Sequence, residues 1–290
     1  MKIIIRPKKE NIDIFIKEGI KHFFLPLKNM SIDYIDTFTK EEIKKIKEEN
    51  EELSLWIIMN KNFSNFEIVE LTSTMKYLDE LNLGGFLFYD NSIIQIKKEL
   101  NLKTELVWDK AHMVTNYKTC DYYYEMGLNY GVVSTEITME KIENMSKNTS
   151  MKLMLPLVYY PKVAFSKRRL ISHYNEYYKH DKKEKLTVNE KISNQNYKLI
   201  ENDNGTSFIL ENLVNGVLYL DRIIKSNIEH IVIHDEFDVN LVTSLIKNIN
   251  YCFNNVDNKD FSYEQWVDKQ KELLGDYTSF FEKNTIYKVK

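Results

Sequence analysis

Polar side chains that could carry out acid–base chemistry follow two consecutive predicted strands. The first strand, over 105–108, is followed by His112 and Asn116, and the second, over 130–134, is followed by Glu136. Imidazole and carboxylate groups can exchange protons with a substrate, and an amide can orient it. A carboxylate in this place could equally cap the helix that follows, because a helix N-terminus favours an anion. We therefore expect His112 and Glu136 to be catalytic and Asn116 to contact the substrate, with the capping role of Glu136 as the alternative.

His230 and His234 are four residues apart, a spacing that would place both on one face of a helix. The residues between them, Ile-Val-Ile, are instead typical of a strand, along which four residues span about 13 Å. One metal ion cannot reach both side chains, and we expect no metal site in the chain. His234 would leave the strand at its C-terminal end, either as a third catalytic residue or as an ordinary hydrogen-bonded residue.

A basic and aromatic segment further along the chain contains five residues that could bind a substrate: Lys167, Arg168, Arg169, His173 and Tyr177. Positive charges and aromatic rings together suit contacts to phosphates with stacking on bases, or binding of an acidic small molecule. The stretch 162–191 holds nine Lys or Arg against four Asp or Glu, whereas the whole chain has a net charge of −3. Binding to nucleic acid would therefore be local to this segment. The alternative is a solvated helix whose tyrosines pack on the protein body.

Short apolar runs alternate with amphipathic helical segments along the chain and would position these residues. The predicted strands span 2–6, 22–27, 53–60, 85–89, 105–108, 130–134, 152–157 and 230–234. The predicted helices span 12–18, 40–50, 72–82, 92–100, 117–126, 139–147, 218–226 and 239–252. Eight strands that are each followed by a helix predict an α/β fold of the (β/α)₈ TIM-like barrel type, with an open doubly wound sheet as the alternative. In both, ligands bind at the C-terminal ends of the strands.

About sixty residues, 159–217, separate the seventh predicted strand from the next helix. Their first half is the basic segment, which predicts a helix. Their second half contains Asn-Gly at 204–205 between two apolar runs, which is a strong signal for a β-hairpin. Long insertions at the C-terminal face of a barrel are usually functional. We expect residues 1–290 to form a single barrel domain in which this insertion covers the mouth.

Composition excludes several classes of protein. Hydrophobic residues make up 43% of the chain and charged residues 29%, as in folded soluble proteins. The apolar runs are too short to cross a membrane, and the N-terminal run is too short for a signal peptide, so we expect a cytoplasmic protein. Cys120 and Cys252 are too far apart in sequence to suggest a disulfide framework or a set of metal ligands.

Four segments of the chain resemble the peptidase U32 family: 108–141, 166–177, 201–206 and 280–283. Within that family they are most similar to the short, cysteine-poor subunit of the prephenate-dependent system that hydroxylates tRNA uridine at carbon 5. The resemblance covers most of the chain in the same order and is closest from about residue 105 to the end. It implies a barrel that binds tRNA and works in wobble-uridine hydroxylation as a heterodimer with a cysteine-bearing U32 paralogue.

The resemblance also bears on cofactors. Many members of the family carry four cysteines after the seventh strand that would hold an iron–sulfur cluster. Residues 159–217 contain no cysteine, and Lys167, Arg168 and Arg169 stand in the region where those members have it. An iron–sulfur cluster is therefore implied only for the paralogous partner, with prephenate as an anionic co-substrate. Whether this chain is itself an enzyme stays open: the alternatives are a U32-type peptidase, hence a hydrolase, and a non-catalytic binding or scaffold barrel.

Overall fold

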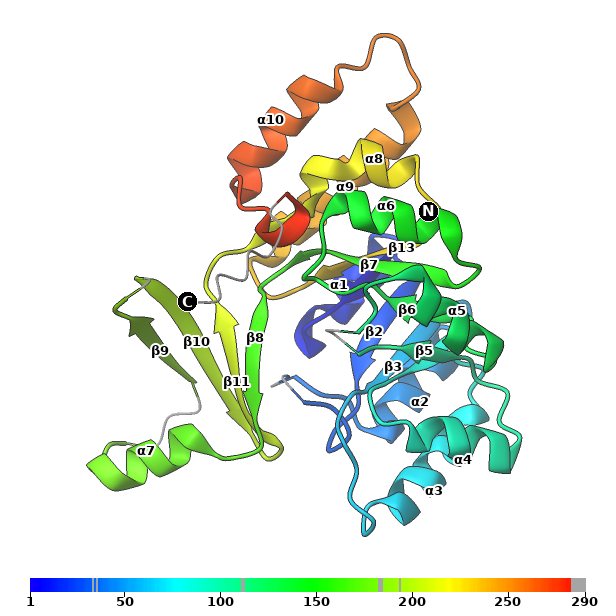
Figure 1. The fold of residues 1–290 in the computed structure, drawn as a ribbon, viewed down its shortest axis with the longest axis vertical. Helices are drawn as coiled ribbons and strands as arrows, with labels where there is room; N and C mark the ends of the chain where they lie inside the picture. The colour runs from blue at the N-terminus through cyan, green and yellow to red at the C-terminus, as the bar shows by residue number, and fades with distance from the viewer. Residues whose placement is uncertain (33, 35, 111–112, 182–184, 193, 283–290) are drawn as a thin grey trace.

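The largest sheet of the protein closes into a barrel. The computed structural model describes residues 1–32, 34, 36–110, 113–181, 185–192 and 194–282 (Figure 1). Within these residues, eight parallel strands pair in the order β7-β13-β1-β2-β3-β4-β5-β6, and β6 pairs back with β7. They are β1 Lys2–Arg6, β2 His22–Pro26, β3 Ser54–Met59, β4 Gly85–Phe88, β5 Leu106–Trp108, β6 Tyr130–Val132, β7 Lys152–Tyr159 and β13 Ile228–His234. The predicted (β/α)₈ barrel is confirmed, and the open sheet is excluded.

Helices pack around the outside of the barrel. They are α1 Ile12–Lys17, α2 Lys40–Glu49, α3 Ile68–Asp79, α4 Ser92–Leu100, α5 Tyr117–Glu125, α6 Met139–Asn148, α8 Leu220–Ile224, α9 Val239–Asn255 and α10 Tyr263–Leu274, with short 3₁₀ turns at Lys9–Asn11, Gly216–Tyr219 and Ser279–Phe281. Local sequence explains where several of them begin. Thr39 and Glu42 form a reciprocal capping box at the start of α2, and the Thr138 hydroxyl accepts from the Lys141 amide at the start of α6. None of the helices in the described ranges is long and apolar enough to cross a bilayer.

Apolar side chains fill the barrel interior. They form a cluster of their own, distinct from the larger core between the sheet and the helices: Ile4, Phe24, Trp56, Ile58, Leu87, Val107, Val132, Met154 and Val232. Below this cluster, at the N-terminal end of the strands, His230 is fully buried and contacts the rings of His22, Trp56 and Tyr130 edge-on. Burial, followed by repulsion from His22 and nearby lysines, lowers the pKa of His230 to about 3. The barrel is therefore packed through its centre, and barrels of this type bind ligands at their C-terminal end.

Residues 159–217 form a second, smaller sheet beside the barrel. Its strands β8 Lys162–Ser166, β9 Lys185–Glu190, β10 Gln195–Asn202 and β11 Gly205–Leu210 are antiparallel, in the order β8-β11-β10-β9. Figure 1 shows this sheet to one side of the barrel, with helix α7 (Leu170–Tyr178) at one end of the sheet. The chain returns through β12 (Val214–Asn215), which pairs with β7. The insertion thus leaves the barrel and rejoins it at the same strand.

The hairpin turn between β10 and β11 is attached to the barrel. The side-chain amide of Asn202 donates to the Tyr34 carbonyl oxygen at 2.9 Å, and that of Asn204 donates to the Ser31 carbonyl oxygen at 2.9 Å. Gly205, the residue that begins β11, has a φ of +141°, and a Cβ there would lie 2.1 Å from the Ser166 carbonyl oxygen. The turn therefore requires glycine, and its two asparagines fix the insertion to the loop after β2.

Glu201 holds the N-terminus of α7. Its carboxylate accepts from the amides of Ile171 (2.7 Å) and Ser172 (3.2 Å) and from the hydroxyls of Ser172 and Thr206. Burial opposes ionisation, but these hydrogen bonds outweigh it and lower the pKa of Glu201. The carboxylate also satisfies amides that a helix start leaves without partners.

We expect Glu201→Gln to loosen α7, because the amide side chain places a donor against the donors that Glu201 accepts from. A missing charged hydrogen bond of this kind costs about 1–3 kcal/mol. Tryptic cleavage after Arg168 and Arg169 should therefore become about tenfold faster under native conditions. Glu176→Gln, an exposed carboxylate on the same helix, is the matched control and should leave the cleavage rate unchanged. Equal rates in the two variants would contradict the anchoring role of Glu201.

Candidate functional site

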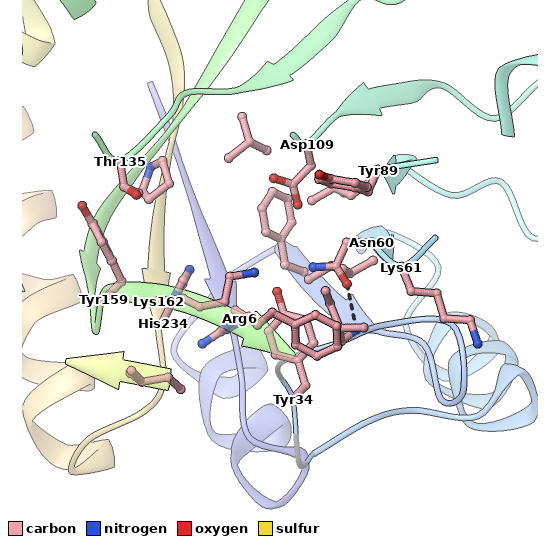
Figure 2. A pocket seen from close by; sticks show the side chains of 18 of the residues that line it. Arg6, Tyr34, Asn60, Lys61, Tyr89, Asp109, Thr135, Tyr159, Lys162 and His234 are labelled. Atoms are coloured by element: carbon pink, nitrogen blue, oxygen red, sulfur yellow. Dashed lines mark hydrogen bonds between the residues drawn. The ribbon is translucent and has the colours of Figure 1, made fainter. Parts of the chain in front are cut away.

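A cavity of about 600 Å³ lies at the C-terminal ends of the barrel strands, between them and the insertion (Figure 2). Its floor is the top of the barrel interior, with Phe24, Ile58 and Val232. Its cover comes from β8 and β11, with Phe165 and Ile209 among the lining residues. A volume of this size suits a small organic ligand, and the position is where TIM barrels bind their substrates.

Five polar side chains line the cavity from the ends of five different strands: Arg6, Asn60, Tyr89, Asp109 and His234. Each stands two residues after a side chain that packs inside the barrel, as Asn60 stands after Ile58. Because successive side chains of a strand point to opposite faces, this spacing directs all five toward the barrel axis. The strand pattern alone therefore brings together residues that are far apart in sequence.

Arg6 is the best-placed cation of the cavity. Its side chain is 10% exposed, forms an ion pair with Glu236 through Nη2, and lies over the Tyr34 ring at 4.6 Å from the ring centre. The Oε2 atom of Glu236 also accepts a hydrogen bond from the backbone amide of Tyr160, at 3.5 Å. A guanidinium has five N–H donors in a planar fork, so the pair with Glu236 leaves donors for a second acceptor. Arg6 can therefore bind a carboxylate or phosphate of a ligand without giving up its own partner.

Three lysines share the cavity with Arg6: Lys61 after β3, and Lys162 and Lys167 from the insertion. The Lys61 ammonium lies 2.5 Å from a carboxylate oxygen of Glu67, and this hydrogen bond lowers the pKa of Glu67 to about 2. Lys61 also donates to the Asn204 side chain at 3.4 Å, which links the cavity wall to the hairpin turn. Two charged groups therefore lie at the seam where the insertion meets the barrel.

His234 forms part of the cavity wall beside Arg6. Its side chain is 18% exposed, its Nδ1 lies 3.9 Å from a Glu236 oxygen, and its ring centre lies 5.9 Å from that of Tyr159. Burial, and then the positive charge of Arg6, lowers the pKa of His234 well below 6.5. The imidazole is therefore neutral at pH 7 and can accept a hydrogen bond or a proton.

Tyr159 and Thr135 lie together on another side of the cavity (Figure 2). The Tyr159 side chain is buried, and burial raises its pKa despite a hydrogen bond with Thr135. The phenol therefore keeps its proton at neutral pH and can donate it in a hydrogen bond. The neighbouring Glu136 is exposed and is not among the residues that line the cavity. It does not cap α6 either, since Thr138 occupies that position.

Of the other residues predicted from the sequence, the structure brings one to the cavity. His112 lies outside the described residues. The Asn116 side chain accepts from the Thr119 amide at 3.0 Å and caps α5, away from the cavity lining. Lys167 lines the cavity, whereas Arg168, Arg169, His173 and Tyr177 are exposed at and before α7. The structure thus brings His234 and Lys167 to one cavity. Sequence reasoning missed Arg6, Asn60, Tyr89 and Asp109.

A second cavity of about 420 Å³ lies between the insertion sheet and the ends of β1 and β2. It shares five lining residues with the first: Arg6, Tyr34, Tyr160, Ile209 and Glu236. Much of its remaining lining is apolar, with Leu199 and Ile200 among the residues on β10. The Arg6–Glu236 pair therefore stands between two adjoining chambers.

Comparison with known families decides the assignment. Residues 8–278 match the family described as Peptidase family U32. The chain belongs to this family. A curated relative from Bacillus subtilis (strain 168), named tRNA hydroxylation protein P2, is 23% identical over 94% of each chain. Solved structures similar to this U32 protein include a putative lyase/mutase from Burkholderia cenocepacia (7% identity, 96% and 92% of the two chains, TM-score 0.44) and a phosphoribosyl anthranilate isomerase from Thermus thermophilus (8% identity, 54% and 76%, TM-score 0.40).

The cysteines of this U32 protein do not fit an iron–sulfur cluster. Cys120 on α5 and Cys252 on α9 are both buried. Burial, and then a nearby aspartate in each case, raises the thiol pKa to about 12 for Cys120 and about 11 for Cys252. Cluster ligands and cysteine nucleophiles both act as thiolates. The described residues thus offer two buried thiols on separate helices, whereas an iron–sulfur cluster is held by four ligands.

Proposed function

We propose that this U32 protein acts in the 5-hydroxylation of tRNA wobble uridine, with prephenate as the oxygen donor. The observation that carries the proposal is the cavity at the strand ends, where Arg6 has donors to spare and three lysines lie nearby. The name of the Bacillus subtilis relative supports the tRNA pathway. The protein would work in the cytoplasm, where tRNA is modified.

The cavity suits prephenate, a small dianion with two carboxylates and an unsaturated ring. Arg6 would hold one carboxylate through its free donors, and Lys61 or Lys167 would lie near the other. Phe165 and Ile58 supply apolar walls for the ring. His234, which is neutral, would accept a proton or a hydrogen bond, and Tyr159 would donate one. This chain would thus bind and orient the donor molecule.

We further propose that a cysteine-bearing U32 paralogue completes the system as a heterodimer partner. Support comes from the chemistry of this chain's own cysteines, which are buried and protonated. A cluster would therefore belong to the partner alone. The exposed residues Arg168, Arg169, His173 and Tyr177, together with Lys167, would contact tRNA.

Nucleoside mass spectrometry of total tRNA tests the proposal. In a strain that lacks this gene and has no redundant route, we expect 5-hydroxyuridine and its derivatives to disappear. The wild-type gene should restore them, and a Lys167→Ala/Arg168→Ala variant should not. Unchanged 5-hydroxyuridine in the deletion strain would overturn the proposed function.

A further inference from the structure

Four aromatic rings gather on the surface at the C-terminal half of α7: Tyr174, Tyr177, Tyr178 and His180, here called the ring cluster. The His180 ring stacks on Tyr174 and Tyr178, with ring centres 5.8 and 6.1 Å apart, and Tyr178 also contacts Tyr174 and Tyr177. The side chains remain open to solvent, with Tyr177 79% exposed and Tyr178 57% exposed. Large exposed aromatic groups of this kind usually mark an interaction site.

The ring cluster is not needed to attach the helix. Ile171 and Asn175 form the buried face of α7, and Glu201 holds its N-terminus. The tyrosines stand outside these contacts, so packing against the sheet does not explain them. Their rings are therefore available for a partner.

Exposed basic side chains lie at both ends of α7, with exposed carboxylates at Glu176 and Asp181, and Arg169 is paired with Glu201 at 3.6 Å. Arg168 and Arg169 precede α7, and Lys179 follows it, all exposed. The stretch 162–191 carries nine basic against four acidic residues, whereas the rest of the chain is acidic. The net positive charge of this segment therefore favours binding of a polyanion there, against the net negative charge of the rest of the chain. Cations next to stacked aromatic faces are the combination that binds single-stranded nucleic acid.

The ring cluster is also connected to the cavity. Lys167 lines the cavity, and α7 begins only three residues later at Leu170. An α-helix rises 1.5 Å per residue, so the whole of α7 extends about 14 Å from that point. A single-stranded RNA segment of a few nucleotides that runs past Arg168 and Arg169 could therefore reach from the ring cluster to the cavity mouth.

We propose that the ring cluster stacks the unpaired bases of an RNA loop while a neighbouring nucleotide enters the cavity. The proposal rests on the proposed function and adds to it the form of RNA that binds. Bases within a duplex have no free faces, so recognition by stacking selects single-stranded loops. Tyr177 and Tyr178 supply stacking, and Arg168 and Arg169 supply contacts to phosphates.

Fluorescence anisotropy with the purified full-length protein tests this directly. The probes are a labelled 17-nucleotide RNA hairpin with a seven-nucleotide loop and a blunt RNA duplex of the same composition. We expect the hairpin to bind more tightly, and Tyr177→Ala and Tyr178→Ala each to weaken its binding about tenfold with an unchanged salt dependence. Tyr177→Phe keeps a stacking face and should bind as wild type does. Arg168→Ala/Arg169→Ala should instead reduce the slope of log K against log salt by about 0.7 for each phosphate that the protein no longer neutralises.

Tyr251→Ala is the matched control, since Tyr251 is 56% exposed on α9 and stacks against no base in this proposal. It should leave hairpin binding unchanged. Two results would overturn the proposal. One is a Tyr177→Ala/Tyr178→Ala variant that binds the hairpin within twofold of wild type. The other is a variant of these tyrosines that loses binding to the paralogue but keeps binding to RNA. A deletion strain that retains 5-hydroxyuridine, while the purified protein still binds the hairpin through its tyrosines, would sink the proposed function and leave the ring cluster supported.

Discussion

We expect Arg6→Gln to slow the 5-hydroxylation that the gene restores in a deletion strain by about a hundredfold. Arg6 is 10% exposed, is paired with Glu236, and lines both cavities. If its remaining donors hold a carboxylate of the oxygen donor, their loss costs about 3 kcal/mol, which corresponds to about a hundredfold in rate. The initial rate of hydroxylation, followed by nucleoside mass spectrometry after induction, is the measurement.

Loss of Arg6 also leaves the partly buried Glu236 without its ion-pair partner, and an unpaired charge at such a place destabilises a fold. The double variant Arg6→Gln/Glu236→Gln removes that effect, because no charge is left unpaired. We expect the double variant to regain stability in urea denaturation but not hydroxylation. Arg222→Gln is the matched control, since it breaks an arginine–glutamate pair with Glu143 on the outside of the barrel. Recovery of hydroxylation in the double variant would show that Arg6 acts only through the fold.

The stability of the protein should fall steeply between pH 6.5 and pH 4, and His230 should account for a large part of the slope. His230 is fully buried and its pKa is lowered to about 3, so the folded protein keeps it neutral where the unfolded chain is protonated. The unfolded state then binds one more proton, and the free energy of unfolding falls by about 1.4 kcal/mol for each pH unit below 6.5. The contribution is fully present above pH 6.5 and is lost as the pH falls through 3, by about 5 kcal/mol in total.

His230→Phe keeps a ring among Trp56, Tyr130 and His22 but cannot be protonated. The free energy of unfolding of this variant, measured by urea denaturation at pH 7, 6 and 5, should depend less steeply on pH than that of wild type. The difference in slope should correspond to close to one proton. His173→Phe replaces an exposed histidine on α7 and should retain the wild-type slope. Parallel pH profiles for wild type and His230→Phe would mean that folding does not lower the pKa of His230.

The barrel could be predicted from the sequence because each of its strands is a run of apolar residues bounded by polar ones. All eight strands lie within a few residues of their predicted bounds. The insertion was harder to predict. Strand β8 (Lys162–Ser166) is half exposed and lacks a buried face that would produce an apolar pattern. Strand β9 (Lys185–Glu190) pairs with β10 at the outer edge of the small sheet, and α10 (Tyr263–Leu274) has a mostly polar surface.

The site could be predicted only in part. His234 could be predicted because it ends an obvious strand. Alternate side chains of a strand point to the same face, so the residue two positions after an interior side chain also faces the cavity. This rule identifies Asn60 after Ile58 and Asp109 after Val107. Asn116 shows the opposite problem, since an asparagine before a helix is as well suited to a cap as to a substrate. Contacts between segments distant in sequence, such as Glu201 with the start of α7, leave no local pattern.

The closure of the barrel has a consequence for the order in which the protein is made. Strand β1, at residues 2–6, has β13, at residues 228–234, as one of its two neighbours, and Arg6 pairs with Glu236. A ribosome must therefore synthesise about four-fifths of the chain before the first strand meets this partner. Contacts of such long sequence separation form late, because the entropy of loop closure must be overcome first. A chain that ends before β13 thus cannot close the barrel and lacks His234 and Glu236 of the cavity wall.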